Sequence, residues 1–299
     1  MNLLLHLAAG NGDLINTTGV IIQLKAQYPQ ITIDFLCKKS QAYLLQLNPA
    51  INEVLHFEDY GILLKTGHPK SHERQVITNI MGYDKYINIW CNSPFDGDFP
   101  LSKKELLKKH GLGLNCSRED INGVLFPTER DLDIVHQFAE LHLSEKRRKV
   151  VLIEDDSFNA KFFRNSEQLS QITSQRLIAK ELLKRDFYVI SNNIEKTILC
   201  SDLNLIQIKC LFELYGDIFL GLSSGITTSF FTNSDHYENK MFIIAGQPQW
   251  NYCKFIKGMK HHFFTKNYDW GKLYANFRIF DRSVRCGEFE DVERAGESV

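Results

Sequence analysis

The chain lacks the features that mark several protein classes. Its seven cysteines form no C-x-x-C pair and are odd in number, which argues against a disulfide or zinc framework and predicts reduced thiols. No window holds eighteen consecutive apolar residues, so we expect no membrane-spanning helix. With 35 basic and 36 acidic side chains, the net charge of −1 argues against the nucleic-acid backbone as the main partner.

A targeting segment is also not expected. The apolar run at residues 3–9 has no basic residue before it and ends at Gly10, which is too short for a signal peptide. Together with the reduced thiols, this predicts a cytoplasmic protein. The 299 residues contain 43% hydrophobic and 24% charged side chains, values typical of a globular chain, and the length predicts two domains of about 150 residues each.

Apolar runs alternate with amphipathic stretches along the whole chain. Residues 3–8 are predicted to form a strand, 15–27 a helix and 31–37 a strand, and such a βαβ unit implies a parallel sheet. Residues 115–130 are expected to be loop and strand. Further helices are expected at 41–47, 101–113, 131–143, 166–184 and 205–215, and further strands at 53–57, 85–90, 150–154, 187–190, 217–222 and 241–245.

A short charged run at residues 144–149 is the best candidate for a domain boundary, because a second strand–helix series starts after it. We therefore expect an α/β protein with an N-terminal domain at 1–148 and a C-terminal domain at 149–299. Each domain is expected to hold a Rossmann-like sheet, and the two domains to face a central cleft.

A glycine-rich turn follows the first expected strand. Gly10-Asn11-Gly12-Asp13 lets a ligand approach the backbone closely, and the following helix start favours an anion, although the turn does not fit G-x-G-x-x-G. Two interpretations stay open. Asp13 is the N-cap of a tight turn, or its carboxylate is a general base at the carboxyl edge of the sheet, where α/β proteins bind ligands.

A second turn of the same kind follows the strand at 217–222. Its glycine and small hydroxyl residues either offer N–H and O–H groups to a diphosphate or form an ordinary Ser/Thr helix cap. A serine hydrolase is disfavoured, because no motif supplies an acid and a His as partners of the serines. The turn reads Ser223-Ser224-Gly225-Ile226-Thr227-Thr228-Ser229.

Basic residues at three places are candidates for binding an anion. Lys161 follows the first strand of the second half, where it either neutralises a phosphate or is a solvated lysine. A basic loop and a basic helix either contact an anionic glycan or a membrane surface, or form ordinary solvated faces. The loop carries Lys70, His72 and Arg74, and the helix carries Lys103, Lys104, Lys108 and Lys109.

Seven segments of the chain together resemble a known family, although none of them is diagnostic on its own. They are Gly12-Asp13 and residues 28–36, 44–54, 83–87, 160–163, 216–225 and 246–248. In order and spacing these segments resemble glycosyltransferase family 9, the lipopolysaccharide heptosyltransferases. The resemblance extends over most of residues 1–250.

The resemblance implies a GT-B fold and an inverting, metal-independent glycosyltransferase without a cofactor. Such an enzyme moves a heptose or other hexose-like sugar from a nucleotide sugar to a hydroxyl of an anionic glycan, such as lipopolysaccharide or another surface polysaccharide, in peripheral contact with the inner membrane surface. Asp13 is then the general base. The residues implied for the donor are Lys161, Ser223, Ser224, Gly225, Thr227, Thr228 and Gln247, and those for the acceptor are Asn11, Gly12, Lys70, His72 and Arg74.

Two positions depart from the family pattern. Ser223 stands where the family has an Asp, and Thr228 stands where it has a His. Both positions are expected near the donor, so the sugar and the nucleotide stay open. Two alternatives therefore remain: a nucleotide-sugar-binding protein on the same scaffold without catalysis, and a transferase that acts on a protein or a nucleic acid.

Overall fold

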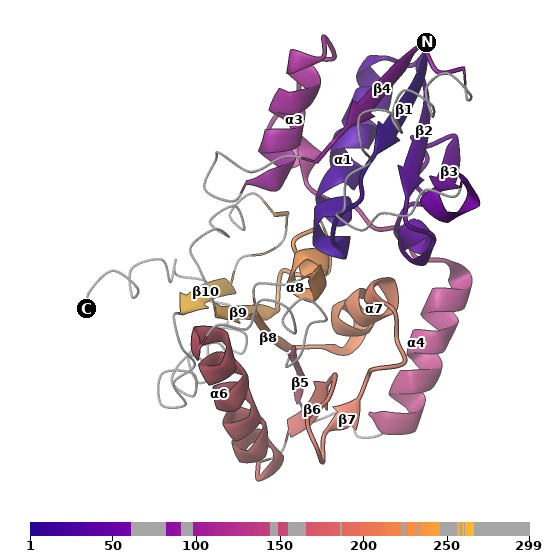
Figure 1. The fold of residues 1–299 in the computed structure, drawn as a ribbon. Helices are drawn as coiled ribbons and strands as arrows, with labels where there is room; N and C mark the ends of the chain where they lie inside the picture. The colour runs from indigo at the N-terminus through magenta and orange to yellow at the C-terminus, as the bar shows by residue number, and fades with distance from the viewer. Residues whose placement is uncertain are drawn as a thin grey trace.

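The protein is built on two separate parallel β-sheets with helices packed against them, as Figure 1 shows. The α/β class and the two-sheet arrangement expected from the sequence are confirmed. The computed structural model describes residues 1–60, 82–90, 98–143, 149–154, 166–185, 187–222, 225–232, 234–245, 256–257, 259 and 261–265.

The N-terminal sheet has four parallel strands in the order β3-β2-β1-β4. Its central strand β1 pairs through Leu5 with Phe35 on one side and with Ile87 on the other. Leu3, Leu4 and Leu5 are all fully buried, as expected for a strand covered on both faces. The elements are β1 (Asn2–His6), α1 (Asn11–Gln27), β2 (Thr32–Cys37), η1 (Lys39–Leu44), β3 (Glu53–His56), η2 (Phe57–Tyr60), β4 (Lys85–Asn88), α3 (Phe99–Lys109) and η3 (Glu119–Ile121).

The C-terminal sheet has six parallel strands in the order β10-β9-β8-β5-β6-β7. Helix α6 covers one face, where Ile178, Ala179 and Leu182 pack on the apolar side chains of β5 and β8. The elements are β5 (Lys149–Ile153), α6 (Ser166–Leu183), β6 (Phe187–Ser191), β7 (Ile198–Leu199), α7 (Leu205–Tyr215), β8 (Ile218–Leu222), α8 (Gly225–Phe230), β9 (Met241–Ala245) and β10 (His261–Thr265), with α4 (Glu129–His142) leading in from the N-terminal half.

Two sequence predictions differ from the structure. Where the sequence predicts a helix at 41–47, the structure has the 3₁₀ helix η1 (Lys39–Leu44). The side-chain amide of Gln41 in η1 donates a hydrogen bond to the Ala9 carbonyl, in the loop after β1. No strand is found in residues 115–130, and Gly123 forms only an isolated parallel bridge with Thr232 of the other half. This bridge joins the N-terminal part to the C-terminal part directly.

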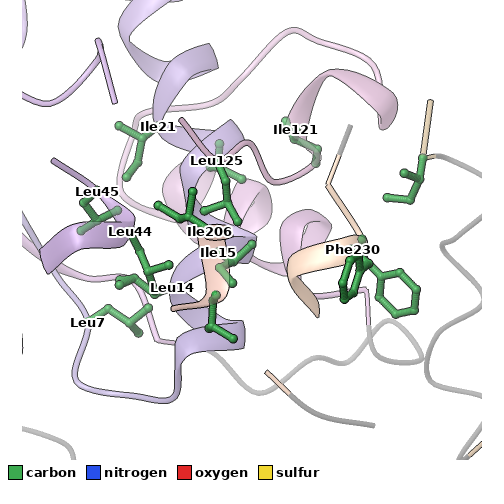
Figure 2. Close-up of a cluster of buried hydrophobic side chains, with 14 of the residues drawn as sticks. Leu7, Leu14, Ile15, Ile21, Leu44, Leu45, Ile121, Leu125, Ile206 and Phe230 are labelled. Atoms are coloured by element: carbon green, nitrogen blue, oxygen red, sulfur yellow. The ribbon is translucent and has the colours of Figure 1, made fainter. Parts of the chain in front are cut away.

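Helix α1 is buried on nearly all sides, because it packs between the N-terminal sheet on one side and both η3 and α8 on the other. Ile15 and Ile21 lie in one continuous hydrophobic core with Ile121, Leu125 and Phe230, shown in Figure 2. Phe230 of α8 also packs against Phe219 of β8, with ring centroids 4.3 Å apart. The first helix of one half is therefore packed onto a helix of the other half.

Two glycines allow this close packing. A Cβ atom on Gly19 would lie 1.9 Å from the carbonyl oxygen of Asn122, and one on Gly123 would lie 2.8 Å from the carbonyl oxygen of Ile15. The hydroxyl of Thr18 accepts a hydrogen bond from the Val124 N–H at 2.8 Å. The close approach of the backbone at Gly19 and Gly123 therefore sets the distance between α1 and residues 119–124.

Helix α4 packs against α7 through a polar cluster. The Asp131 carboxylate accepts hydrogen bonds from Gln207 at 2.9 Å and from Asn204 at 3.4 Å, and the Thr128 cap donates to its other oxygen. Burial raises the pKa of Asp131, but these hydrogen bonds outweigh it and hold the pKa below its usual value. The domain boundary at 148 stays a prediction, and residues 144–148 lie outside the described ranges.

We expect Gly19→Ala to destabilise the protein. Alanine favours a helix by about 1 kcal/mol over glycine, but overpacking against a fixed backbone costs about 1–3 kcal/mol and more where the overlap is this large. Urea unfolding should show a net loss of about 1–2 kcal/mol. Gly113→Ala is the matched control, because its new Cβ meets only the Lys108 side chain at 3.7 Å. Equal unfolding midpoints for the two variants would contradict the close-packing argument.

Candidate active site at the ends of β1 and β8

The turn after β1 is shaped by a capping interaction. Gly10, with φ −74° and ψ 165°, is the N-cap of α1, and Asp13 stands at the third helical position. Its Oδ2 accepts a hydrogen bond from the Gly10 N–H at 3.3 Å. The expectation that Asp13 is itself the N-cap is therefore wrong by three positions, because the helix begins at Asn11, four residues before the start that the apolar pattern predicts. A carboxylate in this first turn is also stabilised by the helix dipole.

Gln41 holds the same turn from the side. Its amide nitrogen donates to the Ala9 carbonyl and to the Asn11 side-chain oxygen, both at 2.9 Å. Gln41 is buried, whereas Asn11, Gly12 and Asp13 are half-buried. The three residues predicted from the glycine motif thus lie together on a braced turn that solvent can reach.

The turn after β8 is held by a residue that the sequence analysis missed. Glu154, directly after β5, is 1% exposed, and its Oε2 accepts from the Leu222 N–H at 3.1 Å and from the Thr227 hydroxyl at 2.6 Å. Thr227 and Thr228 are both buried in α8. The Thr227 side chain therefore points into the domain toward Glu154, and Gly225 is the first residue of the helix.

The two helices that follow these turns pack on each other. Gly123 lies between them, so that a Cβ there would contact both Ile15 of α1 and Thr232, two residues after α8. Figure 1 shows the start of α1 directly beside α8. Because each helix follows the carboxyl end of its strand, the structure brings the predicted base and the predicted donor turn to the junction of the two halves.

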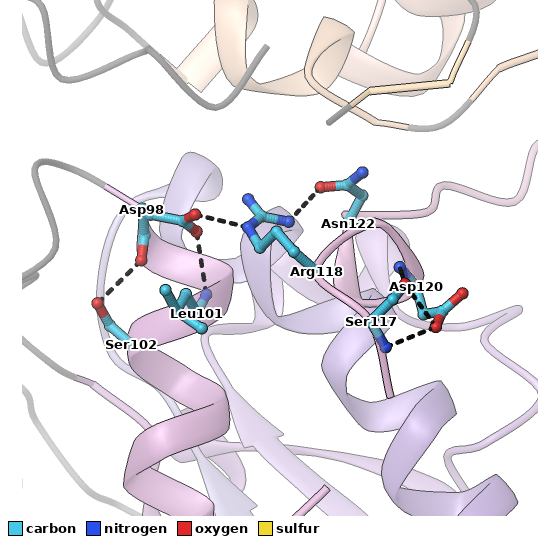
Figure 3. Close-up of polar contacts among 7 residues, drawn as sticks. All are labelled: Asp98, Leu101, Ser102, Ser117, Arg118, Asp120 and Asn122. Atoms are coloured by element: carbon cyan, nitrogen blue, oxygen red, sulfur yellow. Dashed lines mark hydrogen bonds and ion pairs between the residues drawn. The ribbon is translucent and has the colours of Figure 1, made fainter. Parts of the chain in front are cut away.

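A second polar group at this junction was also missed, because no sequence motif marks it. Arg118 pairs through Nε with Asp98 and through Nη1 with Asn122, both at 2.5 Å (Figure 3). The other Asp98 oxygen caps α3 by accepting from the Leu101 N–H. Arg118 and Asp98 are 11% and 13% exposed, so this pair fixes the start of α3 against the segment that touches α1.

The four lysines predicted to form a basic face on the helix at 101–113 are not all exposed. Lys103 is 1% exposed, with its amine 3.3 Å from the Ile89 carbonyl, and Lys104 donates to the Cys116 carbonyl at 2.6 Å. Lys108 and Lys109 are exposed. The long apolar stems let the first two lysines turn inward, which a pattern that counts lysine as surface cannot foresee.

Several predicted site residues cannot be placed. Nothing in the described ranges bears on the following seven, which all lie outside them: Lys161, Ser223, Ser224, Gln247, Lys70, His72 and Arg74. Among the residues that are described, no group of three or more His, Cys, Asp or Glu side chains is arranged to hold a metal ion.

Comparison with known proteins identifies the fold. No protein-family model matches the sequence, and no curated protein matches it. Among solved structures, a glycosyl transferase family 9 protein from Veillonella parvula DSM 2008 has a TM-score of 0.62 at 10% identity, over 98% of this chain and 91% of that one. The E. coli ADP-heptose LPS heptosyltransferase II has a TM-score of 0.56 at 13% identity, over 95% and 100%.

A third structure has the same architecture. An E. coli heptosyltransferase with ADP has a TM-score of 0.53 at 8% identity, over 94% of this chain and 100% of that one. At these identities the similarity is one of fold. The protein therefore has the two-sheet GT-B architecture of the family 9 glycosyltransferase structures along nearly its whole length.

Proposed function

We propose that the protein is a glycosyltransferase that moves a sugar from a nucleotide-sugar donor to a hydroxyl group. The observation that carries the proposal is the Asp13 carboxylate on a braced, solvent-accessible turn at the carboxyl end of β1, at the junction of two parallel sheets. The architecture shared with family 9 and heptosyltransferase structures supports this reading.

Asp13 suits the part of general base. Its Oδ2 accepts a single long hydrogen bond from Gly10, and Oδ1 has no hydrogen bond to the described part of the chain. A half-buried carboxylate can take the proton of an acceptor hydroxyl while the hydroxyl oxygen attacks the anomeric carbon of the donor sugar. Attack from the face opposite the leaving diphosphate inverts the configuration.

The donor is a nucleoside diphosphate sugar held by the C-terminal half. One of the similar structures is a heptosyltransferase with ADP, which supports a nucleotide as part of the donor. We assign the diphosphate to Lys161 and to the turn at Ser223, Ser224 and Gly225, with Gln247 close to the sugar. A lysine and backbone N–H groups stabilise the leaving charge, so we propose a metal-independent reaction.

The acceptor is a glycan that the N-terminal half binds. Asn11 and Gly12 directly precede Asp13. We assign the basic residues Lys70, His72 and Arg74 to the acceptor as well, which suits an acidic or phosphorylated glycan such as lipopolysaccharide. No helix in the described ranges has the length and apolarity needed to cross a bilayer. We propose peripheral contact with the cytoplasmic membrane surface for access to such an acceptor.

A binding protein without catalysis is the second candidate. It is favoured by Thr228, which stands where family 9 has a His and is only 2% exposed. A thermal-shift and hydrolysis screen against ADP-, GDP-, UDP- and CMP-sugars separates the two readings. Stabilisation with slow donor breakdown supports the enzyme, whereas stabilisation without any turnover supports the binding protein.

Asp13→Asn tests the base directly. The amide keeps an oxygen that can accept from the Gly10 N–H, so the helix cap persists, but it cannot take a proton. We expect transfer to fall at least about a hundredfold with an unchanged unfolding midpoint. Asp13→Ala should lose both the cap and the activity. Transfer above a few per cent of wild type in Asp13→Asn removes Asp13 from the mechanism.

Lys161→Ala tests the donor site. Loss of a charge-assisted contact to the diphosphate should raise the donor dissociation constant about tenfold in calorimetry. Lys161→Arg keeps the charge and should recover part of the affinity. Lys108→Ala, which changes an exposed lysine at the end of α3, is the control and should bind the donor as wild type does. An unchanged constant in Lys161→Ala contradicts the assignment.

A further inference from the structure

A buried carboxylate joins the two sides of the turn that follows β8. The Leu222 N–H belongs to the last residue of β8, and the Thr227 hydroxyl belongs to the first turn of α8. Both donate to the same oxygen of Glu154, at 3.1 and 2.6 Å. One side chain therefore fixes the end of the strand relative to the start of the helix.

The register of the sheet places Glu154 for this task. Strands β5 and β8 are parallel neighbours, with Ile153 paired to Leu220, and the Glu154 N–H continues the ladder by donating to the Leu220 carbonyl at 2.9 Å. Glu154 thus emerges at the carboxyl edge beside β8, one step past its last paired residue. At 1% exposure a carboxylate is costly unless hydrogen bonds stabilise it.

The neighbouring residues leave room for the interaction. A Cβ on Gly221 would lie 2.5 Å from the Thr227 hydroxyl oxygen, so a side chain there would displace the hydroxyl from Glu154. Phe230, at the other end of α8, is fixed among aromatic rings, 4.3 Å from Phe219 and 5.2 Å from Phe212 between centroids. The helix is therefore held at its end by apolar packing and at its start by Glu154.

We propose that Glu154 is a positioning residue for donor binding: through Leu222 and Thr227 it fixes the end of β8 against the start of α8, the two ends of the turn that we assign to the donor diphosphate. This inference rests on the proposed function, because it takes the turn to be the donor site. Glu154 does not touch the donor. It sets how the two ends of that turn stand relative to each other, and Thr227 takes part through its hydrogen bond to Glu154.

The test measures binding of ADP, GDP, UDP and CDP by calorimetry, with the diphosphate that wild type binds most tightly as the probe. Thr227→Val removes the hydroxyl at nearly constant volume and should raise the dissociation constant about tenfold. Thr227→Ser restores the hydroxyl and should recover most of the affinity. Glu154→Ala should lose at least as much as Thr227→Val, and Glu154→Gln, which keeps one accepting oxygen, should fall between Glu154→Ala and wild type.

A double-mutant cycle and a control variant separate an effect on the donor turn from a general loss of stability. If the two residues act as a unit, Glu154→Ala with Thr227→Val should bind no more weakly than Glu154→Ala alone. Thr128→Val removes the hydroxyl that caps α4 far from the turn. It should lower the unfolding midpoint and leave the dissociation constant unchanged.

The outcomes distinguish this inference from the proposed function. Wild-type binding that Thr227→Val and Glu154→Ala leave unchanged overturns the inference and leaves the donor site intact. A similar loss of affinity in Thr128→Val also overturns it, because the effect is then one of stability. If wild type binds none of the four diphosphates, the proposed function fails and the inference fails with it. Thr227→Val decides the question alone if Glu154→Ala does not fold.

Discussion

The contact between helix α1 and the backbone at Asn122 and Gly123 determines how the two halves of this protein meet. A helix normally keeps 8–10 Å from a packed neighbour because side chains separate the axes. Here Gly19 lets a carbonyl reach the helix surface, and Gly123 lets the same segment bridge to Thr232. The hydrophobic core then runs without a break from the N-terminal sheet to α8.

This packing has a direct consequence for the site. Each sheet ends in a strand-to-helix turn, and the helices that leave those turns, α1 and α8, are the ones that pack together. The Asp13 carboxylate and the turn after β8 are therefore brought to one junction by apolar and backbone contacts, with no need for polar contacts between them. The ion pair between Arg118 and Asp98 adds to this packing, because it fixes the start of α3 to the segment at residues 118–123 that contacts α1.

The sequence predicts most of the fold because its apolar runs and cap residues act locally. Helix α7 begins and ends where expected, since Asn204 caps it by accepting from the Gln207 N–H. The site is predicted less well, because its remaining parts depend on tertiary contacts. Lys103 is expected on a basic helix face, yet it is buried. Glu154 is expected only as the last residue of a strand, yet it accepts a hydrogen bond from Leu222, 68 residues away in the sequence.

Capping and catalysis are often treated as competing explanations of an acidic residue in a first helical turn, but at Asp13 they support each other. A carboxylate has two oxygens, and the hydrogen bond from Gly10 uses only Oδ2. That bond restricts the side chain to one orientation, and Gln41 fixes the loop on which the orientation depends. A base must be held in place before the acceptor arrives, because ordering it during the reaction would add to the barrier. In the proposed reaction the cap supplies this order in advance, and Oδ1 is the oxygen that we propose receives the proton.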